Sequence, residues 1–372
     1  MILLSRRVAA VGSATAIAIA VVAVGCGIGR GAVKSEAKRA ISPCGTATAP
    51  TWSPDGTQIA WYGYRWPRPH NDAVGSYNIL RAVCASDADG KHVHRLRNTV
   101  CSERCSNAFG DPPDRLDWVG PTLLLAGNDL GIFTVSVGQK PELLGKTGPV
   151  PFSVDASGDR AASGTNDCSG CSGPVKIFSV PSGSVVGVVG GTKLANGEPS
   201  LSPDGTQVVF TRSSAKDSGP GPAIWTAAAD GSHLQRLERR GNGPLWSPAG
   251  NRIAYLAPTG PARSAWRLVA AQGGASTTLL RNGPGTVFGW SPNGRWIAFP
   301  DSKRKLAVID VATKKVRRLL KLQLPYESSS VAWSPNSRQL LVVWRPPPHS
   351  SCPTGLWRVP IDGAKPRLVH GC

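Results

Sequence analysis

Thr51-Trp-Ser-Pro-Asp-Gly-Thr-Gln-Ile-Ala-Trp61 is the first of five copies of one short phrase in this 372-residue chain. Each copy has an aromatic or apolar residue, then Ser-Pro, then a turn residue, then a run of strand-forming residues. The other copies are Ser200–Phe210, Leu245–Tyr255, Gly289–Phe299 and Ala332–Val342. Self-similarity at a fixed period is typical of a repeat architecture, so most residues of the phrase belong to the scaffold.

The phrase predicts a tight β-hairpin. Pro at the second turn position presets φ for a type I turn, and Asp or Asn tolerates the third position. Gly then takes the left-handed conformation that restores strand pairing. The residues that follow, such as Gln207–Thr211 and Arg295–Phe299, are short runs rich in Val, Ile and aromatics, and are predicted to be strands.

Two more strands complete each repeat unit. The third strand is predicted at Ile224–Gly231, Leu306–Asp310 and Leu356–Gly363, and the fourth at His233–Leu237, Lys315–Leu320 and Pro366–Val369. The Ser of the phrase recurs every 43 to 45 residues, at Ser202, Ser247, Ser291 and Ser334. Four strands at this period are typical of a propeller blade.

Two degenerate units occupy the chain after the first copy. One is Leu116–Leu125 with Gly131–Ser136, and the other is Phe152–Arg160 with Val175–Val180. We therefore predict an all-β protein, a β-propeller of seven four-stranded blades, or six if one degenerate unit is an insertion. The predicted domains are residues 1–26 as signal peptide or membrane anchor, 27–47 as a flexible tether and 48–372 as a single propeller.

The Ser-Pro-Asp-Gly phrase resembles the WD40-like (PD40) repeats of TolB-type propellers, which also occur in the propeller domains of prolyl-oligopeptidase relatives. The resemblance covers roughly residues 48–371. It implies the propeller fold and leaves the function open, because this fold hosts many roles. The two degenerate units depart from the pattern.

The first residues predict export. Arg6 and Arg7 precede an apolar stretch from Val8 to Val24, which is the pattern of a signal peptide. Ala23-Val-Gly-Cys26 is similar to a bacterial lipobox, in which Cys26 would be lipidated and become the new N-terminus. The alternatives are an uncleaved N-terminal anchor, since Val8–Ile28 is about long enough to span a membrane, and ordinary cleavage. All three predict an extracytoplasmic protein, and the first two hold it at the cell membrane.

Eight further cysteines indicate disulfides in such a compartment. Cys352 and Cys372 lie ten residues on either side of Asp362, so they would face each other across the last hairpin. Small loop bridges are expected for Cys168 with Cys171 and for Cys101 with Cys105. Cys44 would then pair with Cys84, or alternatively with Cys372. Zinc binding by the close pairs is disfavoured in an oxidising compartment. Redox activity of Cys168 and Cys171 is disfavoured because such a motif normally opens a helix beside a strand, whereas this pair lies in a Gly-rich loop.

The sequence contains no recognisable catalytic motif. The sequence lacks the Gly-x-Ser-x-Gly of a hydrolase and leaves no length for such a domain, so a peptidase is disfavoured. His92 and His94 share one face of a strand, but two ligands are weak support for a metal, and a solvated strand explains them. We assign no catalytic, cofactor-binding or metal-binding residue and expect no cofactor.

The unrepeated loop Arg65–Asp72 is the first candidate for partner contact. Eleven of the twelve Trp fall on repeat strands, where packing between blades is expected, and Trp66 is the exception. Loops on a rigid scaffold often carry binding residues, so Arg65, Trp66, Arg68 and His70 are candidate contacts. The alternative role of this loop is to cover one face of the ring.

The formal charge of +19 gives a second candidate, because the basic residues gather late in the chain. They are Arg236, Arg239, Arg240, Lys303–Lys305, Lys314, Lys315, Arg317, Arg318 and Lys321. A basic edge would attract lipid headgroups, an acidic envelope polymer or an acidic protein. The alternative is an Arg-rich composition with no single partner. Nucleic acid is disfavoured, because the chain is predicted to be exported and its aromatics to be used in packing.

Together these features predict a non-catalytic, membrane-tethered, monomeric β-propeller that binds an envelope protein or an anionic polymer or lipid surface as a scaffold. The alternative is an envelope hydrolase or lyase with its site at the mouth of the central channel. Converging Asp, Glu, His or Arg with perturbed pKa values at that mouth would favour the enzyme, and an apolar, neutral lining would favour the binding module.

Overall fold

A computed structural model defines the fold of one part of the chain, Ser42–Cys372, which separates from Met1–Ile41 as a compact unit. The residues described are 44–65, 80–98, 115–120, 123–128, 131–136, 142–146, 152–164, 172–180, 182–214, 221–260, 263–283, 285, 287–323, 331–344 and 355–371. None of them belongs to a helix that could span a bilayer.

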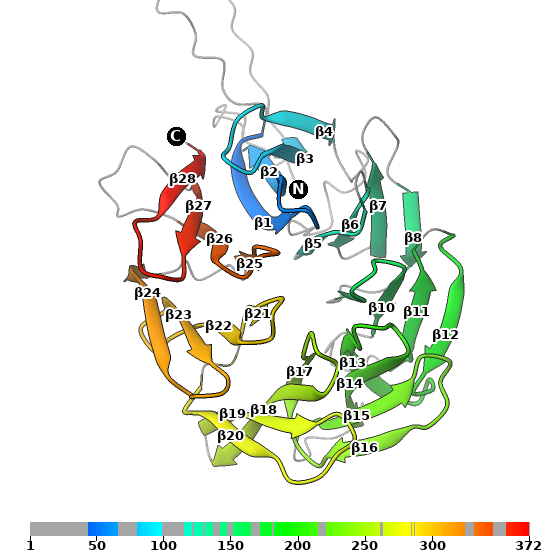
Figure 1. The fold of residues 1–372 in the computed structure, drawn as a ribbon. Helices are drawn as coiled ribbons and strands as arrows, with labels where there is room; N and C mark the ends of the chain where they lie inside the picture. The colour runs from blue at the N-terminus through cyan, green and yellow to red at the C-terminus, as the bar shows by residue number, and fades with distance from the viewer. Residues whose placement is uncertain are drawn as a thin grey trace, which may run out of the picture. The chain divides into compact units, whose positions relative to one another are not determined.

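The strands of these residues form seven four-stranded antiparallel sheets, here called blades 1 to 7 in chain order (Figure 1). Blade 1 has β1 (Thr46–Trp52), β2 (Gln58–Arg65), β3 (Leu80–Asp87) and β4 (His94–Asn98). Blade 2 has β5 (Arg115–Trp118), β6 (Leu123–Asn128), β7 (Gly131–Ser136) and β8 (Glu142–Lys146). Blade 3 has β9 (Phe152–Val154), β10 (Arg160–Ser163), β11 (Val175–Ser179) and β12 (Val185–Val189). Blade 4 has β13 (Leu194–Leu201), β14 (Gln207–Ser214), β15 (Ala223–Ala228) and β16 (Gln235–Glu238).

The remaining three blades follow the same order. Blade 5 has β17 (Asn242–Trp246), β18 (Arg252–Gly260), β19 (Arg263–Ala270) and β20 (Thr277–Arg281). Blade 6 has β21 (Gly289–Trp290), β22 (Trp296–Pro300), β23 (Lys305–Asp310) and β24 (Val316–Gln323). Blade 7 has β25 (Val331–Trp333), β26 (Gln339–Trp344), β27 (Gly355–Pro360) and β28 (Arg367–His370). The predicted propeller is confirmed, and both degenerate units are complete four-stranded blades among the described residues.

The Ser-Pro phrase builds the turn between the first two strands of a blade. In the first copy, the Gly56 amide donates to the Ser53 carbonyl at 2.9 Å, and Gly56 has a φ of 73°. The Ser53 hydroxyl donates to Asp55 at 2.6 Å and accepts the Gln58 amide at 2.9 Å. The five phrase serines are at most 4% exposed. Serine is used here because its hydroxyl satisfies a buried backbone amide that the turn leaves without a partner.

The hydrophobic core lies between neighbouring blades. One cluster joins Trp266 and Leu268 of blade 5 to Ile297 and Phe299 of blade 6, and the other clusters repeat this arrangement around the ring. All eleven tryptophans expected on repeat strands lie on strands. Their large apolar surfaces hold one blade against the next, which is the packing role predicted for them.

Blade 1 meets blade 7 without exchanging a strand, since each sheet is built from one continuous part of the chain. A buried cluster joins Trp61 and Cys84 of blade 1 to Leu341 and Leu356 of blade 7. The ring of described strands is therefore closed by side-chain packing and by a few hydrogen bonds rather than by a shared sheet.

Candidate functional site

The first strand of each blade lies nearest the ring centre, and charged side chains are few on these strands in the described part of the chain (Figure 1). Arg115 and Asp117 of β5 form an ion pair with Nε and Oδ2 2.6 Å apart. Burial raises the pKa of Asp117, and Arg115 opposes that rise. Glu198 of β13 accepts the Gly243 amide of the next blade at 2.8 Å. Each of these three charged side chains is therefore already bound to another residue of the propeller.

Polar groups near the centre link one blade to the next. The indole Nε1 of Trp290 donates to the Leu245 carbonyl at 3.3 Å, and that of Trp333 donates to the Gly289 carbonyl at 3.1 Å. The Ser200 hydroxyl accepts the Trp246 amide at 3.0 Å. These bonds fix the spacing of the inner strands. Among the described residues, no group of three or more His, Cys, Asp or Glu is arranged to hold a metal ion.

A buried polar cluster at blade 4 was not anticipated from the sequence. The Asn196 amide nitrogen donates to the Gly173 carbonyl at 2.6 Å, and its oxygen accepts Arg212 Nε at 2.8 Å. Arg212 donates to the Gly190 carbonyl at 2.6 Å and lies 4.7 Å from the Trp225 ring centroid. Burial lowers the pKa of Arg212. The Gly173 carbonyl lies in blade 3 and the Gly190 carbonyl directly follows its last strand, so the Asn196–Arg212 pair of blade 4 joins two blades.

The largest concentration of charge lies on blades 6 and 7. Here the basic sector means the described Lys and Arg side chains of residues 289–370: Arg295, Lys303, Arg304, Lys305, Lys314, Lys315, Arg317, Arg318, Arg338, Arg358, Lys365 and Arg367. These 12 cations face only three carboxylates, Asp301, Asp310 and Asp362. Described side chains of residues 115–189, in blades 2 and 3, comprise three cations and four carboxylates. Described side chains of residues 193–281, in blades 4 and 5, comprise nine cations and four carboxylates, so the excess of positive charge grows along the chain and is largest on blades 6 and 7.

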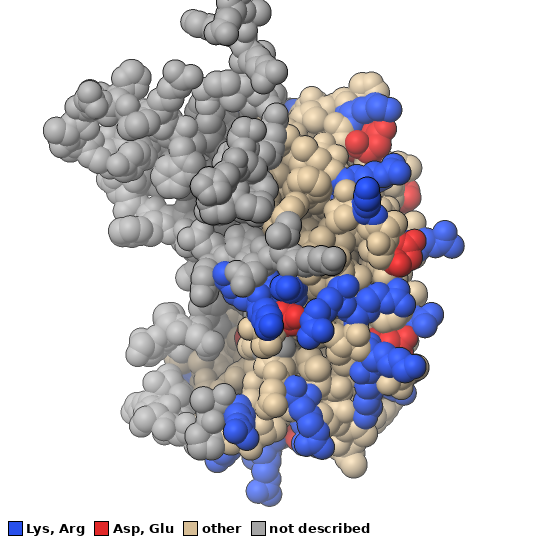
Figure 2. Space-filling model, turned by 90° about the vertical axis from the view of Figure 1, so that its left-hand side faces the viewer, with Lys and Arg blue, Asp and Glu red and all other residues tan. Residues whose placement is uncertain are grey.

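Figure 2 shows the side of the ring where β24, β27 and β28 lie, with Lys and Arg spread over it and few acidic groups between them. Two of the three carboxylates are buried beneath their arginines. Arg295 Nε lies 2.9 Å from Asp310, and Arg318 Nε lies 2.7 Å from Asp301, while both arginine side chains are more than 60% exposed. The exposed layer of this surface is positive.

The same contacts set the pKa values of the two aspartates. The Thr313 amide and then Arg295 lower the pKa of Asp310 to about 2. Burial alone would raise the pKa of Asp301, but Arg318 and the Lys305 and Lys303 amides outweigh it and the pKa is lowered. Both carboxylates therefore stay ionised and hold their arginines in place at neutral pH.

A pocket of about 230 Å³ opens within the basic sector. It is lined by Gln339, Arg358, Pro360, Ala364, Lys365 and Arg367. Arg358 is held by the Ala88 carbonyl of blade 1 at 2.8 Å. Arg317 reaches across from blade 6 to the Ile361 carbonyl at 2.7 Å, and its guanidinium lies 5.6 Å from the Trp296 ring centroid. Arginines held in this way present their remaining donors to an anion with little further ordering.

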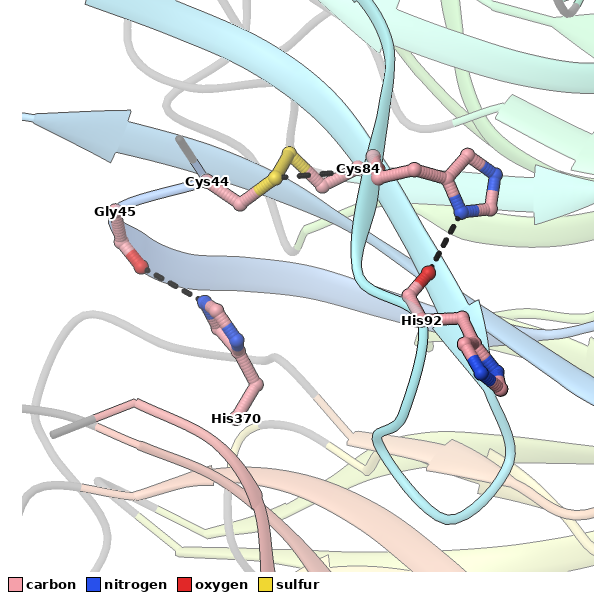
Figure 3. The surroundings of a disulfide bond; sticks show 6 residues. Cys44, Gly45, Cys84, His92 and His370 are labelled. Atoms are coloured by element: carbon pink, nitrogen blue, oxygen red, sulfur yellow. Dashed lines mark hydrogen bonds between the residues drawn. A yellow bond between two sulfur atoms is a disulfide. The ribbon is translucent and has the colours of Figure 1, made fainter. Parts of the chain in front are cut away.

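Figure 3 shows the start of the propeller, where Cys44 forms a disulfide with Cys84 of β3. This is one of the two pairings expected for Cys44. The neighbouring carbonyl of Gly45 lies 3.3 Å from His370 Nε2 at the end of blade 7. The other expected cysteines, Cys101, Cys105, Cys168, Cys171, Cys352 and Cys372, and the lipidation candidate Cys26, lie outside the described residues.

His92 and His94 are both exposed and serve their own hairpin. His92 Nδ1 lies 2.5 Å from Asp87, and His94 Nδ1 lies 2.9 Å from the His92 carbonyl. Of the candidate contact loop, Arg65 ends β2, and Trp66, Arg68 and His70 lie outside the described residues. Its role in binding stays a prediction.

No protein-family model matches the chain, and no curated protein matches it in sequence. Solved structures do resemble it. A puromycin-hydrolysing peptidase from Mycobacterium tuberculosis aligns with a TM-score of 0.60 at 13% identity, over 88% of this chain and 54% of that chain. An oligogalacturonate lyase from Vibrio parahaemolyticus aligns with a TM-score of 0.58 at 11% identity, over 85% of this chain and 89% of that chain. At these identities the likeness shows the propeller fold alone.

TolB from Acinetobacter baumannii aligns more weakly, with a TM-score of 0.46 at 15% identity, over 83% of this chain and 79% of that chain. A likeness of this size leaves the resemblance of the repeat to TolB-type propellers a prediction.

Proposed function

We propose that this chain is an exported, membrane-tethered β-propeller that does not catalyse a reaction and that binds an anionic partner in the cell envelope as a scaffold. The observation that carries the proposal is the uneven charge of the ring. Blades 6 and 7 present 12 described cations against three carboxylates, whereas blades 2 and 3 are nearly balanced. An Arg-rich composition without a partner would raise the charge of all blades together.

The contacts of the basic sector also support binding. Arginines whose positions are fixed by backbone carbonyls or aromatic rings lose less freedom when they meet an anion than free side chains do. Arg358, which lines the pocket, and Arg317 of the neighbouring blade are both fixed in this way. Electrostatic attraction at such a surface speeds association and selects for acidic partners.

The N-terminal sequence supports the envelope as the place of action. A basic start, an apolar stretch and Ala23-Val-Gly-Cys26 together favour export and lipid attachment at Cys26. The Cys44–Cys84 disulfide agrees with an oxidising compartment. The weak TolB-type resemblance of the repeat is consistent with an envelope protein and carries no weight by itself.

The competing function is that of an envelope lyase or hydrolase. The fold is shared with an oligogalacturonate lyase and a peptidase. The described inner strands, however, place only Arg115 and Asp117 together, and general acid–base chemistry needs further groups within reach of a substrate. The apolar and neutral residues there favour a binding module.

The test uses the full chain, solubilised from membranes, with a panel of acidic and neutral polysaccharides that includes oligogalacturonate. Binding is measured by calorimetry and product by chromatography in the same samples. We expect acidic polymers to bind without product, the affinity to fall as salt rises, and Arg317→Gln/Arg367→Gln to weaken it. Lys193→Gln, an exposed charge removed outside the basic sector, is the control. Multiple turnovers that persist in the Arg317→Gln/Arg367→Gln variant would contradict the proposal.

A further inference from the structure

We propose that the basic sector docks onto phosphate-bearing lipid headgroups of the membrane to which the chain is tethered, through the outer strands β24 and β28 and the pocket beside Arg358. This inference rests on the proposed function, because it needs an exported chain with an N-terminal anchor. To the proposed function it adds the partner, anionic lipid, and the surface that contacts it, which is formed by the outer strands of blades 6 and 7.

The first support is where the propeller begins. Residues 27–43 separate the lipidation candidate Cys26 from Cys44, so even fully extended they span at most about 60 Å. The disulfide fixes Cys44 to blade 1, and the Gly45 carbonyl lies 3.3 Å from His370 at the end of β28. Cys44, where the tethered segment joins the propeller, therefore lies beside blade 7. The basic sector is the charged surface next to it.

Exposed apolar side chains also occur on other described strands, such as Val185 and Val188 of β12, so the second support is that two of them stand beside cations of the basic sector. Val316 of β24 is 43% exposed and lies next to Lys315 and Arg317. Leu368 of β28 is 42% exposed and follows Arg367. A surface for a soluble polyanion needs only the charges. Apolar residues between cations are the pattern of interfacial binding, in which the apolar groups enter the headgroup region while the cations contact phosphates.

The third support is the pocket itself. Its volume of about 230 Å³ can admit a headgroup phosphate, and Arg358, Lys365 and Arg367 line it together with Gln339. Arginine donates two parallel hydrogen bonds to a phosphate, and lysine adds a point charge. Lys314 and Lys315 lie on the turn before β24, so further headgroups would be neutralised along the neighbouring blade.

The experiment is lysine footprinting of the full chain, held by its own anchor in bilayers of phosphatidylcholine with or without phosphatidylglycerol. Acetylation of each lysine is read by mass spectrometry. We expect Lys314, Lys315 and Lys365 to be protected when phosphatidylglycerol is present, and Lys193, which is exposed at the start of blade 4, to react equally in both bilayers. High salt should remove the protection.

Two variants separate charge from apolar insertion. Arg317→Gln/Arg367→Gln should weaken docking about 30-fold, because each cation near an anionic leaflet contributes about fivefold. Val316→Ser/Leu368→Ser should also reduce protection by phosphatidylglycerol, while leaving binding of soluble polyphosphate unchanged. Both variants alter exposed side chains, and unchanged thermal unfolding verifies that each remains folded.

Two results would overturn the inference. Equal acetylation in both bilayers would exclude docking, and the scaffold function would still stand if acidic polymers bind in the assay above. If soluble polyphosphate protects the same lysines as well as the bilayer does, and Val316→Ser/Leu368→Ser has no effect, the sector binds a polyanion and not a membrane. A chain that is cytosolic and has no anchor would contradict the proposed function itself.

Discussion

His370 Nε2 lies 3.3 Å from the carbonyl oxygen of Gly45, although the two residues are 325 positions apart in the chain. The imidazole ring also packs on Trp61, with 4.6 Å between ring centroids. His370 belongs to the last strand of blade 7, and Gly45 precedes the first strand of blade 1. The two ends of the propeller thus meet through one buried side chain, next to the Cys44–Cys84 disulfide.

The His370 contact predicts a pH dependence of stability. Burial lowers the pKa of His370, and the bond to Gly45 opposes that shift. The folded state therefore prefers the neutral ring, and the unfolded state binds more protons below its ordinary pKa of about 6.5. Stability should fall as the pH drops through about 6.5 towards the folded-state pKa, and should be constant on the alkaline side.

The measurement is urea unfolding of wild type and His370→Gln across this pH range. Gln keeps a donor for the Gly45 carbonyl but does not titrate, so the free energy of unfolding should depend less on pH in the variant. If the free energy of unfolding depends on pH equally in the two proteins, titration of His370 is not the cause of that dependence, and the prediction is wrong.

The close approach of blade 1 to blade 7 should require glycine at position 90. A Cβ at Gly90 would lie 2.2 Å from the Val369 carbonyl oxygen, whereas a Cβ at Gly363 would meet nothing within 4 Å. Both glycines have similar positive φ values, 87° and 93°, so Ala costs each about 1–2 kcal/mol. Gly90→Ala should lose about 1–3 kcal/mol more by displacing β28. Equal losses in chemical denaturation would contradict this closure.

The Cys44–Cys84 disulfide should depend on Gly63. Cys44 lies just before β1, and its backbone packs over Gly63 of β2, the strand between β1 and β3, where it reaches Cys84 of β3. A Cβ at Gly63 would lie 2.0 Å from the Cys44 carbonyl oxygen. Removing the bond by Cys44→Ala/Cys84→Ala should cost about 2–4 kcal/mol of unfolding free energy.

Gly63→Ala should prevent the disulfide from forming, and the readout is the free-thiol content of the purified chain. The Gly260→Ala variant is the matched control, because Gly260 is a strand residue without a positive φ, as Gly63 is, and a Cβ there would meet no other atom within 4 Å. A fully oxidised Cys44–Cys84 pair in Gly63→Ala would show that the backbone moves to accommodate the side chain.

The phrase serines should contribute more to stability than the small area of their side chains suggests, because each hydroxyl is a buried hydrogen-bonding group. The fully buried Ser291 hydroxyl donates to Asn293 at 2.7 Å and accepts the Trp296 amide at 2.9 Å. Ser291→Ala leaves that amide buried without its partner, at a cost of about 1–3 kcal/mol. Ser302→Ala, at an exposed turn position of the same blade, should be neutral. Similar denaturation midpoints for both variants would contradict a role for the hydroxyl in the turn.

The fold could be predicted because its determinants are local. Ser-Pro-Asp-Gly specifies a turn with its own atoms, as Ser53 and Asp55 do, and the repeat spacing then gives the blades. The degenerate units were also identified, although Asp155 takes the place of the phrase serine by accepting the Arg160 amide at 3.2 Å. Because the turn forms with Asp in place of Ser, a unit without the Ser-Pro phrase still builds a blade and has to be counted as one.

For the candidate site, the sequence predicts only that basic residues gather late in the chain. It does not predict the contacts that hold these residues in place. The sequence places Arg317 and Ile361 44 residues apart, and only the packing of adjacent blades brings the guanidinium to that carbonyl. The Asn196–Arg212 bond and the Arg358–Ala88 bond likewise need the ring. The sequence leaves Cys44 open to Cys84, the cysteine that remains once the other pairs are assigned, or to Cys372 at the far end of the chain. The approach of Cys44 to Gly63 is a property of the folded sheet.

The most direct test of the central claim is photo-crosslinking of the full chain in intact cells, with a photoreactive residue in place of Ala364 or of Ser182. Both positions are exposed turns, the first at the pocket of the basic sector and the second on blade 3. The proposal predicts that the Ala364 position captures an anionic envelope component, lipid or polymer, and that the Arg317→Gln/Arg367→Gln background abolishes this capture. Equal capture at both positions, or capture unaffected by loss of the two arginines, would contradict it.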